Sequence, residues 1–464
     1  MVLTMQYIST RGENEKRGFQ AAVMTGLARD GGLLLPDVIP NVADKLHAWQ
    51  FLSYTDLAFE VMRLYTDIPE PELRDLINRS YATFRHPDVT PVRSVGDIHI
   101  LELFHGPTLA FKDVALQFLG NTFEYVLKKT GREMNILAAT SGDTGSAAID
   151  GVRGREHINI FVMHPHGRVS PLQERQMTTV LDANVFNIAV DGTFDDCQRI
   201  MKTIFSDLEF KDRYSLGTVN SINWARVLAQ IVYYFFAAFR VMRLTGAKTI
   251  QFSIPTGNFG DIFAGYVAAK MGLPISRLVL ATNENDILSR FFNTGVYSSD
   301  AVHATISPSM DIQVASNFER YLYYRLGANP AALRQIMRQF DTEKKITVSP
   351  LANGKIDNLI SAGAGNTAQT LATIKEFQTR YDYLLDPHTA VGVHVAKPYI
   401  TPGSPMICLA TAHPAKFSQA IQDATGADLA HHPILEALRE LPTRCAILPA
   451  NESDIRRHME KIIR

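Results

Sequence analysis

The chain has 464 residues, of which 46% are apolar and 20% are charged, and its formal net charge is −1. This length and composition predict a folded protein of two or three domains and exclude an intrinsically disordered chain. The near-zero charge gives no support for binding to nucleic acid or to an anionic membrane, so any anionic ligand has to be held by local groups.

The cysteines and the apolar segments indicate where the protein resides. Cys197, Cys408 and Cys445 are too few and too scattered for a disulfide framework or a zinc site, which favours a reducing, cytoplasmic compartment. Residues 1–25 carry several charges and no apolar core, so no secretory signal is predicted. The apolar run at 229–238 is too short to span a membrane and is flanked by arginines, which favours a buried helix.

Predicted elements change in character along the chain. Residues 1–95 indicate helices and turns punctuated by prolines, whereas strands alternate with helices from about residue 96. The predicted strands are 98–101, 136–139, 158–162, 185–190, 249–254 and 278–281, and the predicted helices are 113–129, 172–181, 194–208 and 260–271. This alternation implies βαβ crossovers and a mostly parallel sheet, which binds ligands at the carboxyl ends of its strands. The stretch 361–366 (SAGAGN) fits either a loop or a second junction.

Two turns rich in small residues follow predicted strands. Residues 140–146 (TSGDTGS) precede a helix whose positive end favours an anion, although a well-capped helix without a ligand fits equally well. Residues 255–261 (PTGNFGD) have the outline of a phosphate cradle, with a tight turn as the alternative. Neither turn matches the Walker A or dinucleotide-binding motifs, so nucleotide binding is not predicted.

Lys112 ends the stretch 103–113 (LFHGPTLAFKD) at the expected start of a helix. A cation is unfavourable there because the helix dipole already presents positive charge. The same position and a partly desolvated pocket lower the pKa of a lysine, which suits an amine that attacks an aldehyde. One reactive lysine and two anion-binding turns together predict pyridoxal phosphate, a cofactor that carries both an aldehyde and a phosphate.

Seven motifs across nearly the whole chain resemble those of threonine synthases. They are YISTRG at 7–12, HGPTLAFKD at 105–113, ATSGDTGSAA at 139–148, NSINWAR at 220–226, PTGNFGD at 255–261, DPHTA at 386–390 and LATAHPAKF at 409–417. The chain is similar to the larger, bacterial- and fungal-type branch of that family. The resemblance implies the α/β fold of type II pyridoxal-phosphate enzymes, similar to tryptophan synthase β. That fold has two open, mostly parallel twisted sheets flanked by helices, here with a largely helical N-terminal region.

The same resemblance implies a domain organisation and a reaction. We expect an N-terminal helical region at 1–95, a smaller α/β domain with the Schiff-base lysine and the substrate-carboxylate loop at 96–215, and a larger α/β domain with the cofactor-phosphate turn at 216–464. The implied activity is that of a carbon–oxygen lyase acting on phosphate. It converts O-phospho-L-homoserine and water to L-threonine and phosphate by γ-elimination and then β-addition of water, the last step of threonine biosynthesis, in a monomer or homodimer.

Cofactor-binding residues follow from the resemblance. It implies that Lys112 is the catalytic Schiff-base lysine and that Thr411 places a neutral hydroxyl at the pyridine nitrogen, which tempers the ring as an electron sink. Asp143 stands where much of the wider fold type carries Asn, and a carboxylate beside the cofactor's phenolate is repulsive unless it is protonated or turned away. The residues whose backbone is implied to hold the cofactor phosphate are Gly257, Asn258, Phe259, Gly260 and Asp261.

Substrate-binding residues are implied in two groups. Ser141, Gly142 and Thr144 lie on the loop that receives the substrate α-carboxylate. Arg226, preceded by Asn220 and Asn223, is implied to hold the substrate phosphate, which a guanidinium grips by two parallel hydrogen bonds; a surface arginine at a helix start is the alternative. Lys416, Arg153 and Arg168 are weaker candidates for the same role.

No metal-ligand spacing such as H-E-x-x-H occurs, so no catalytic metal is predicted. Two other functions stay open. One is a related phospho-lyase or dehydratase of the same fold that gives a 2-oxo acid, and the other is a non-catalytic ligand-binding homologue.

Overall fold

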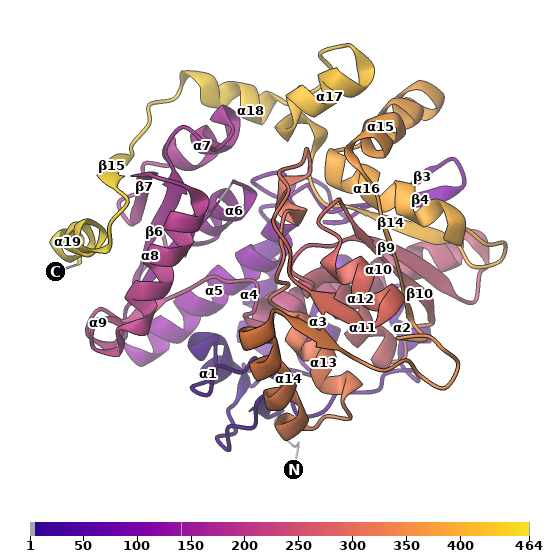
Figure 1. Cartoon of the computed structure of the whole chain (residues 1–464), viewed down its shortest axis with the longest axis horizontal. Coiled ribbons are helices and arrows are strands. Elements are labelled where there is room, and N and C mark those ends of the chain that lie inside the picture. The colour runs from indigo at the N-terminus through magenta and orange to yellow at the C-terminus, as the bar shows by residue number, and fades with distance from the viewer. Residues whose placement is uncertain (1–4, 141, 464) are drawn as a thin grey trace.

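Two parallel sheets of unequal size form the framework of the molecule (Figure 1). The computed structural model describes residues 5–140 and 142–463. The larger sheet has the order β13-β10-β9-β14-β4-β3 and is parallel except for the antiparallel pair β3–β4; the smaller, β15-β7-β6-β5-β8, is parallel throughout. The prediction of two mostly parallel sheets flanked by helices is thus confirmed.

Strand bounds are as follows. The larger sheet comprises β3 (Val92–Val95), β4 (Ile98–Glu102), β9 (Ile250–Pro255), β10 (Ile275–Thr282), β13 (Ile360–Ala364) and β14 (Met406–Ala410). The smaller comprises β5 (Met134–Ala139), β6 (Ile158–Pro165), β7 (Val185–Asp191), β8 (Leu216–Gly217) and β15 (Ala446–Pro449). Two short antiparallel pairs join β1 (Tyr7–Ser9) to β2 (Leu34–Pro36) and β11 (Val296–Ser298) to β12 (Lys345–Thr347).

Helices surround both sheets. The first ten are α1 (Phe19–Thr25), α2 (Leu46–Trp49), α3 (Tyr54–Met62), α4 (Glu70–Tyr81), α5 (Lys112–Thr130), α6 (Asp143–Val152), α7 (Pro171–Thr178), α8 (Phe194–Ser206), α9 (Leu208–Arg213) and α10 (Trp224–Thr245). The others are α11 (Gly260–Lys270), α12 (Ile287–Thr294), α13 (Phe318–Arg325), α14 (Pro330–Glu343), α15 (Thr367–Tyr381), α16 (Pro387–Ala396), α17 (Ser418–Thr425), α18 (Pro433–Ala437) and α19 (Glu452–Ile462). The 3₁₀ helices are η1 (Pro308–Met310), η2 (Lys397–Tyr399), η3 (Pro414–Lys416) and η4 (Leu438–Glu440).

Helices cover both faces of the smaller sheet, and the side chains of its strands point alternately to one face and the other. Leu137 and Phe161 pack with residues of α8 and α19, whereas Ile136 and Ile160 face the main core with α5 and α6. Successive residues of a strand point to opposite faces, so a sheet covered on both sides needs apolar residues at nearly every position. This is why apolar residues predominate at both alternating sets of positions in these strands.

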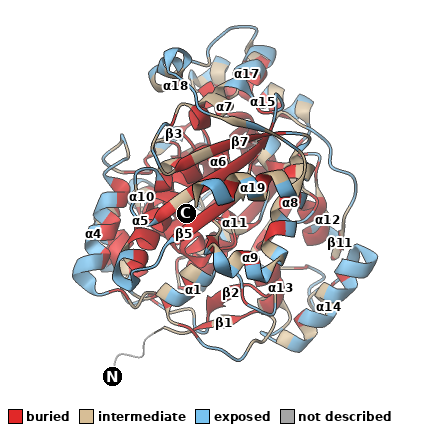
Figure 2. Ribbon diagram, turned by 90° about the vertical axis from the view of Figure 1, so that its left-hand side faces the viewer, coloured by how far each residue is buried: buried red, intermediate tan, exposed pale blue. Residues whose placement is uncertain are grey.

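The apolar run at 229–238 lies in α10, whose residues are mostly buried in the main core, whereas Figure 2 shows mainly exposed residues on an outer helix such as α14. Asn223 begins this helix by accepting the N–H of Ala225, and Gly246 ends it in the left-handed conformation. Among the described residues, α10 alone is long and apolar enough to cross a membrane, yet 78% of its most apolar window is buried inside the fold. It packs against α3, α5 and α11, as the buried-helix prediction requires.

The two sheets do not coincide with the two predicted α/β domains. β4, inside the predicted domain 96–215, belongs to the larger sheet, and β15, inside the predicted domain 216–464, belongs to the smaller one. In Figure 1 the C-terminal segment runs along the top of the molecule through α17 and α18 and reaches the smaller sheet at β15. The domain limits themselves stay a prediction.

The stretch 361–366 forms most of β13 and the turn that follows, a strand that the sequence left open as a loop or junction. Its small residues have low strand propensity, so tertiary contacts decide its conformation. A β-carbon on Gly363 would lie 2.8 Å from Cγ1 of Val395 in α16, so this close approach of helix to strand requires glycine.

Candidate active site

Three adjacent parallel strands, β9, β14 and β4, deliver the main candidate residues to one edge of the larger sheet. The residues after β9 form the turn 256–261, Thr411 follows β14, and the segment after β4 leads to Lys112. Phe111 donates its N–H to the Thr411 carbonyl at 2.8 Å, and His413 donates its N–H to the Leu109 carbonyl at 3.0 Å. The sheet order therefore fixes Lys112 beside the end of β14.

Lys112 is the first residue of α5 and is 8% exposed. Burial lowers the pKa of its amine to about 8, and the cationic groups of Lys416 and Arg226 act in the same direction against Asp143 and Asp113. The predicted helix-start lysine is confirmed in position. Its environment favours the uncharged, nucleophilic amine near neutral pH.

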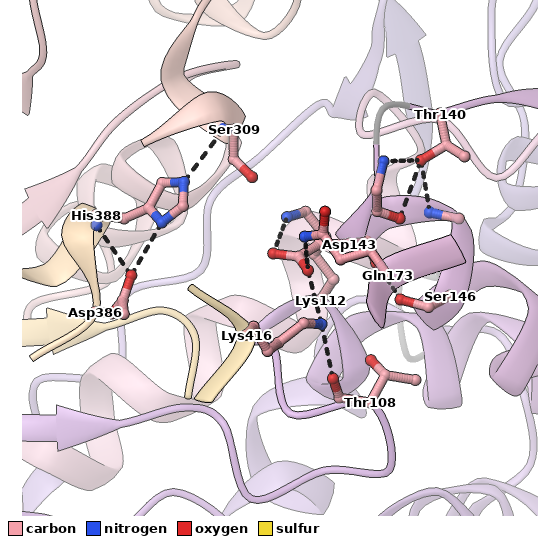
Figure 3. Close-up of polar contacts among 12 residues, drawn as sticks. Thr108, Lys112, Thr140, Asp143, Ser146, Gln173, Ser309, Asp386, His388 and Lys416 are labelled. Atoms are coloured by element: carbon pink, nitrogen blue, oxygen red, sulfur yellow. Dashed lines mark hydrogen bonds and ion pairs between the residues drawn. The ribbon is translucent and has the colours of Figure 1, made fainter. Parts of the chain in front are cut away.

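Asp143 faces Lys112 from the start of α6, which follows β5 of the smaller sheet (Figure 3). Its Oδ2 is 4.0 Å from the Lys112 Nζ, while its Oδ1 is 2.6 Å from the Lys416 Nζ and accepts the Gln173 amide at 2.9 Å. Burial alone would raise the pKa of Asp143, but the ammonium groups of Lys416 and Lys112 hold it well below its usual range. The carboxylate is therefore charged and paired.

The turn after β9 has the properties of an anion cradle. Within the described ranges, none of the backbone N–H groups of residues 257–262 finds an acceptor, and α11 begins in this turn. A β-carbon on Gly257 would lie 2.6 Å from the Ser309 carbonyl, so a side chain does not fit there. Consecutive free N–H groups at the start of an eleven-residue helix fit a phosphate.

The side chain of Asp261, at the end of this turn, points toward α10. Its Oδ1 accepts the hydroxyls of Tyr233 and Tyr234 from α10 at 2.6 and 2.8 Å. Burial raises its pKa to about 6 against these two hydrogen bonds. The side chain thus anchors α11 to α10, and only its backbone is available to an anion in the turn.

The Asp386 carboxylate supports both ends of this edge (Figure 3). It accepts Nδ1–H of His388 at 2.9 Å, and Nε2 of His388 accepts the Ser309 N–H at 3.2 Å, which positions the carbonyl facing Gly257. It also accepts the Thr389 hydroxyl, whose oxygen accepts the Thr411 N–H at 3.3 Å. One carboxylate therefore positions both the turn and the end of β14.

Arg226 supplies a second, separate centre of positive charge. The side chain lies in α10, is 4% exposed, and donates from one terminal nitrogen to the Val219 carbonyl at 3.0 Å. Its Nε is buried without a partner, and among the described residues no carboxylate pairs with the guanidinium. Burial lowers its pKa to about 10. A buried cation without an ion pair is suited to an anionic ligand.

Comparison with known proteins places this geometry in a family. Family profiles for the threonine synthase N terminus and C-terminal region match residues 6–81 and 389–459, and a profile for pyridoxal-phosphate-dependent enzymes matches residues 92–355. The threonine synthase of Saccharomyces cerevisiae is 48% identical over 461 residues, covering 90% of this chain and 88% of that protein. The Pseudomonas aeruginosa threonine synthase is 46% identical, covering 96% of both chains. The chain belongs to the threonine synthase family.

A solved member of the threonine synthase family has the same fold. The pyridoxal-phosphate-bound threonine synthase from Brucella melitensis is 44% identical and superposes with a TM-score of 0.95, covering 99% of this chain and 100% of that one. The predictions of fold, enzyme class and cofactor are confirmed: this is a pyridoxal-phosphate-dependent enzyme. The free N–H groups at 257–262 and the buried Lys112 fit that cofactor.

The residues predicted for the substrate differ in their surroundings. Ser141 lies outside the described residues. Gly142 adopts a φ of 152° at the N-cap of α6, and a β-carbon there would lie 2.6 Å from the Gln173 Oε1. Thr144 is partly exposed, and the N–H groups of Asp143 and Thr144 have no acceptor among the described residues. In this threonine synthase fold, the free N–H groups at the N-terminus of α6 can therefore bind a carboxylate.

The two asparagines before Arg226 both make structural contacts, and their role toward the substrate stays a prediction. Asn223 is buried; its Oδ1 caps α10 and its Nδ2 donates to the Val23 carbonyl at 2.8 Å, so both polar atoms are engaged. Asn220 is exposed, and its Oδ1 accepts the Ser221 hydroxyl at 3.2 Å. Of the three residues predicted to hold the substrate phosphate, only Arg226 has a buried side-chain polar atom without a partner.

Sequence reasoning underrated several residues of this threonine synthase fold. Lys416 was only a weaker candidate for binding the substrate phosphate, although it makes the shortest ion pair to Asp143. Gln173 was not singled out, and Asp386 appeared only within a family motif. No local pattern marks Gln173 or Lys416, because their roles depend on contacts between distant segments.

A cavity of about 610 Å³ is lined in part by Lys416 and Gln173, the two residues that contact the Asp143 carboxylate. Gln173 and Lys416 line it together with residues of α7, the segment 305–308, α17 and α18. Within the described residues, no three His, Cys, Asp or Glu side chains lie close enough to hold a metal ion.

Proposed function

We propose that this chain converts O-phospho-L-homoserine and water to L-threonine and phosphate, the last step of threonine biosynthesis. The observation that carries this proposal is the presence of two separate anion sites near one reactive lysine. The turn 257–261 suits the cofactor phosphate, and the unpaired buried Arg226 suits a second phosphate, that of the substrate. Family membership supports the same reaction.

Cofactor binding is assigned to residues at the edge of the larger sheet. We propose that Lys112 binds the cofactor covalently, that the backbone of Gly257, Asn258, Phe259, Gly260 and Asp261 holds its phosphate, and that the Thr411 hydroxyl meets the ring nitrogen. Thr411 is buried, and among the described residues its hydroxyl has no hydrogen-bond partner. When bound, pyridoxal phosphate supplies an electron-withdrawing ring that acidifies the α- and β-carbons of the substrate.

Substrate orientation and proton transfer fall to this chain's own residues. The N-terminus of α6, with Gly142, Thr144 and Ser141, binds the α-carboxylate of the substrate. Arg226 binds the substrate phosphate and stabilises its charge as it leaves. The uncharged amine of Lys112 removes one proton from Cα and one from Cβ, since it is tethered beside both. Protons return to Cγ after the phosphate has left it and to Cα as water adds its hydroxyl at Cβ. The cavity beside Lys416 and Gln173 provides the route by which substrate and water enter.

Product analysis tests the reaction. Purified protein incubated with O-phospho-L-homoserine should release phosphate and threonine in equal amounts, and Lys112→Ala should release neither. Ammonia and 2-oxobutyrate as the main products would instead assign the related lyase or dehydratase activity. A protein that takes up no pyridoxal phosphate would be a non-catalytic homologue.

We further propose a cytoplasmic location and a monomer or homodimer as the working state. The three cysteines are all free thiols, which supports a reducing compartment. Size-exclusion chromatography with light scattering distinguishes the two oligomeric states.

A further inference from the structure

Two buried lysines compete for one buried carboxylate. Lys416 Nζ is 2.6 Å from the Asp143 Oδ1, whereas Lys112 Nζ is 4.0 Å from Oδ2 (Figure 3). The Lys416 side chain has no exposed surface, and its ammonium also donates to the Thr108 carbonyl at 2.9 Å. Gln173 adds a hydrogen bond to Oδ1. The counter-ion of Asp143 is therefore Lys416, and Lys112 is left at the longer distance.

We propose that Lys416 is a positioning residue that occupies Asp143 and thereby keeps Lys112 free of a counter-ion. This inference rests on the proposed role of Lys112 as the cofactor-binding lysine. The ion pair of Lys416 and Asp143 has no net charge, so it resembles the neutral amide that an asparagine would place here. That accounts for a carboxylate beside the expected phenolate, because Lys416 balances its charge at Oδ1, whereas Lys112 lies 4.0 Å from Oδ2.

Lys416 also fixes the segment from Thr108 to Lys112, which positions the Lys112 side chain. Its ammonium binds the Thr108 carbonyl, and Thr108 donates its N–H and hydroxyl to the Asp113 carboxylate at 2.8 and 2.6 Å. A β-carbon on Gly106 would lie 2.5 Å from the Asp113 Cβ, so the loop is closed tightly on this carboxylate. The segment from Thr108 to Lys112 is thus fixed at one end by Lys416 and at the other by the start of α5.

Charged groups from four elements act on Lys112. They are Asp143 of α6, Lys416 of η3, Arg226 of α10 and Asp113 of α5. Removing Lys416 deletes one repelling cation and leaves Asp143 with Lys112 as its nearest cation. Both changes stabilise the ammonium form, so the pKa of Lys112 rises and less free amine is present at neutral pH.

The test uses full-length protein freed of cofactor and mixed with pyridoxal phosphate. Only the free amine attacks the aldehyde, so the rate at which visible absorbance develops rises with pH and reports the titration of Lys112. For the wild type we expect a midpoint near pH 8, in line with the lowered pKa of Lys112. Lys416→Met should move it upward by at least about one pH unit, a roughly tenfold slower rate below the midpoint. Lys416→Arg should stay near the wild type.

The double variant Asp143→Asn/Lys416→Met separates this role from a merely structural one. Because it removes both charges, its midpoint should return toward that of the wild type. A Lys416→Met midpoint equal to the wild type, or a double variant no different from Lys416→Met, overturns the proposal. If Lys416→Met does not fold, Asp143→Asn serves instead: alone it should lower the midpoint, and adding Lys416→Met should restore it.

A separate control, Lys112→Ala, distinguishes a failure of the proposed role of Lys112 from a failure of the inference about Lys416. If Lys112→Ala still develops the visible band, the assignment of Lys112 fails, and the inference about Lys416 fails with it. If Lys112→Ala is colourless while Lys416→Met titrates like the wild type, only the inference about Lys416 is wrong.

Discussion

Lys112 stands at a position that disfavours a charged ammonium in two ways. It begins α5, where the helix dipole repels a cation, and it is buried. Asp143, the nearest carboxylate that would offset these effects, is bound instead by Lys416. The residue is therefore suited to chemistry that needs an uncharged amine, and the sequence position alone indicated this use.

Arg226 gives a residue-scale prediction for the substrate phosphate. Arg226→Met should raise the Michaelis constant for O-phospho-L-homoserine by about 10- to 100-fold, because a charge-assisted hydrogen bond contributes about 1.5–3 kcal/mol. The visible absorbance of the cofactor should remain. Rates are best compared at pH 9, where loss of the Arg226 charge affects the protonation of Lys112 least.

Arg153 is the matched control. It was another candidate for the substrate phosphate, but the structure pairs it with Asp182 at 2.6 Å on the surface. Arg153→Ala should leave the Michaelis constant within about twofold of the wild type, since surface ion pairs contribute little. Equal effects of the two substitutions, or none for Arg226→Met, would count against the phosphate role.

At the scale of elements, the order of parallel strands assembles the site. β9, β14 and β4 are neighbours in the sheet, although they lie far apart in the sequence. Their carboxyl ends deliver the turn 256–261, Thr411 and the loop before Lys112 to one edge. β5 of the smaller sheet brings Asp143 from the opposite side. The site therefore lies between the two sheets.

Gly257→Ala tests the phosphate turn. The added methyl would lie 2.6 Å from the Ser309 carbonyl, so the turn has to shift, at a cost of about 1–3 kcal/mol. We expect the dissociation constant for pyridoxal phosphate to rise roughly 5- to 150-fold, measured by titration of the cofactor-free protein. Gly365→Ala should bind the cofactor normally, because its methyl would meet only side chains, the His394 ring at 3.3 Å and Val391 Cγ1 at 3.7 Å. Similar affinities for both variants would exclude the turn as the phosphate site.

Elements with a strong local pattern were predictable, and those that depend on distant partners were not. The strands β5, β6 and β7 are mostly apolar, and α11 follows a glycine-rich turn, so their positions agree with the prediction. β13 consists largely of small residues and becomes a strand only by pairing with β10 and packing under α16. Propensity carries no information about such contacts.

The same distinction holds within the site. Lys112 and the turn 257–261 have a chemical pattern in the sequence, whereas Lys416 is defined by its partner Asp143, a contact that only the fold reveals. Asn223 is a second example. Its side chain caps α10 and donates to the Val23 carbonyl, contacts that its motif does not indicate, and its role toward the substrate stays a prediction.

At the scale of the whole molecule, single side chains join the N-terminal region to the site. Arg320 donates to the Leu34 carbonyl at 2.7 Å, to the Ile222 carbonyl at 2.6 Å and to the Asn317 Oδ1 at 2.5 Å. Asn317 in turn donates to the Asn258 carbonyl at 3.1 Å. The β1–β2 pair is thereby tied to the start of α10 and to the phosphate turn, a connection that no part of the sequence indicates alone.

The whole chain also brings two lysines from distant segments against one carboxylate, and only one of them can carry the cofactor. Borohydride reduction of the cofactor-loaded protein, followed by peptide mass mapping, identifies that lysine. We expect the pyridoxyl group on the peptide that contains Lys112 and none on the peptide that contains Lys416. A pyridoxyl group on Lys416, or on any other lysine, would contradict the assignment of the site.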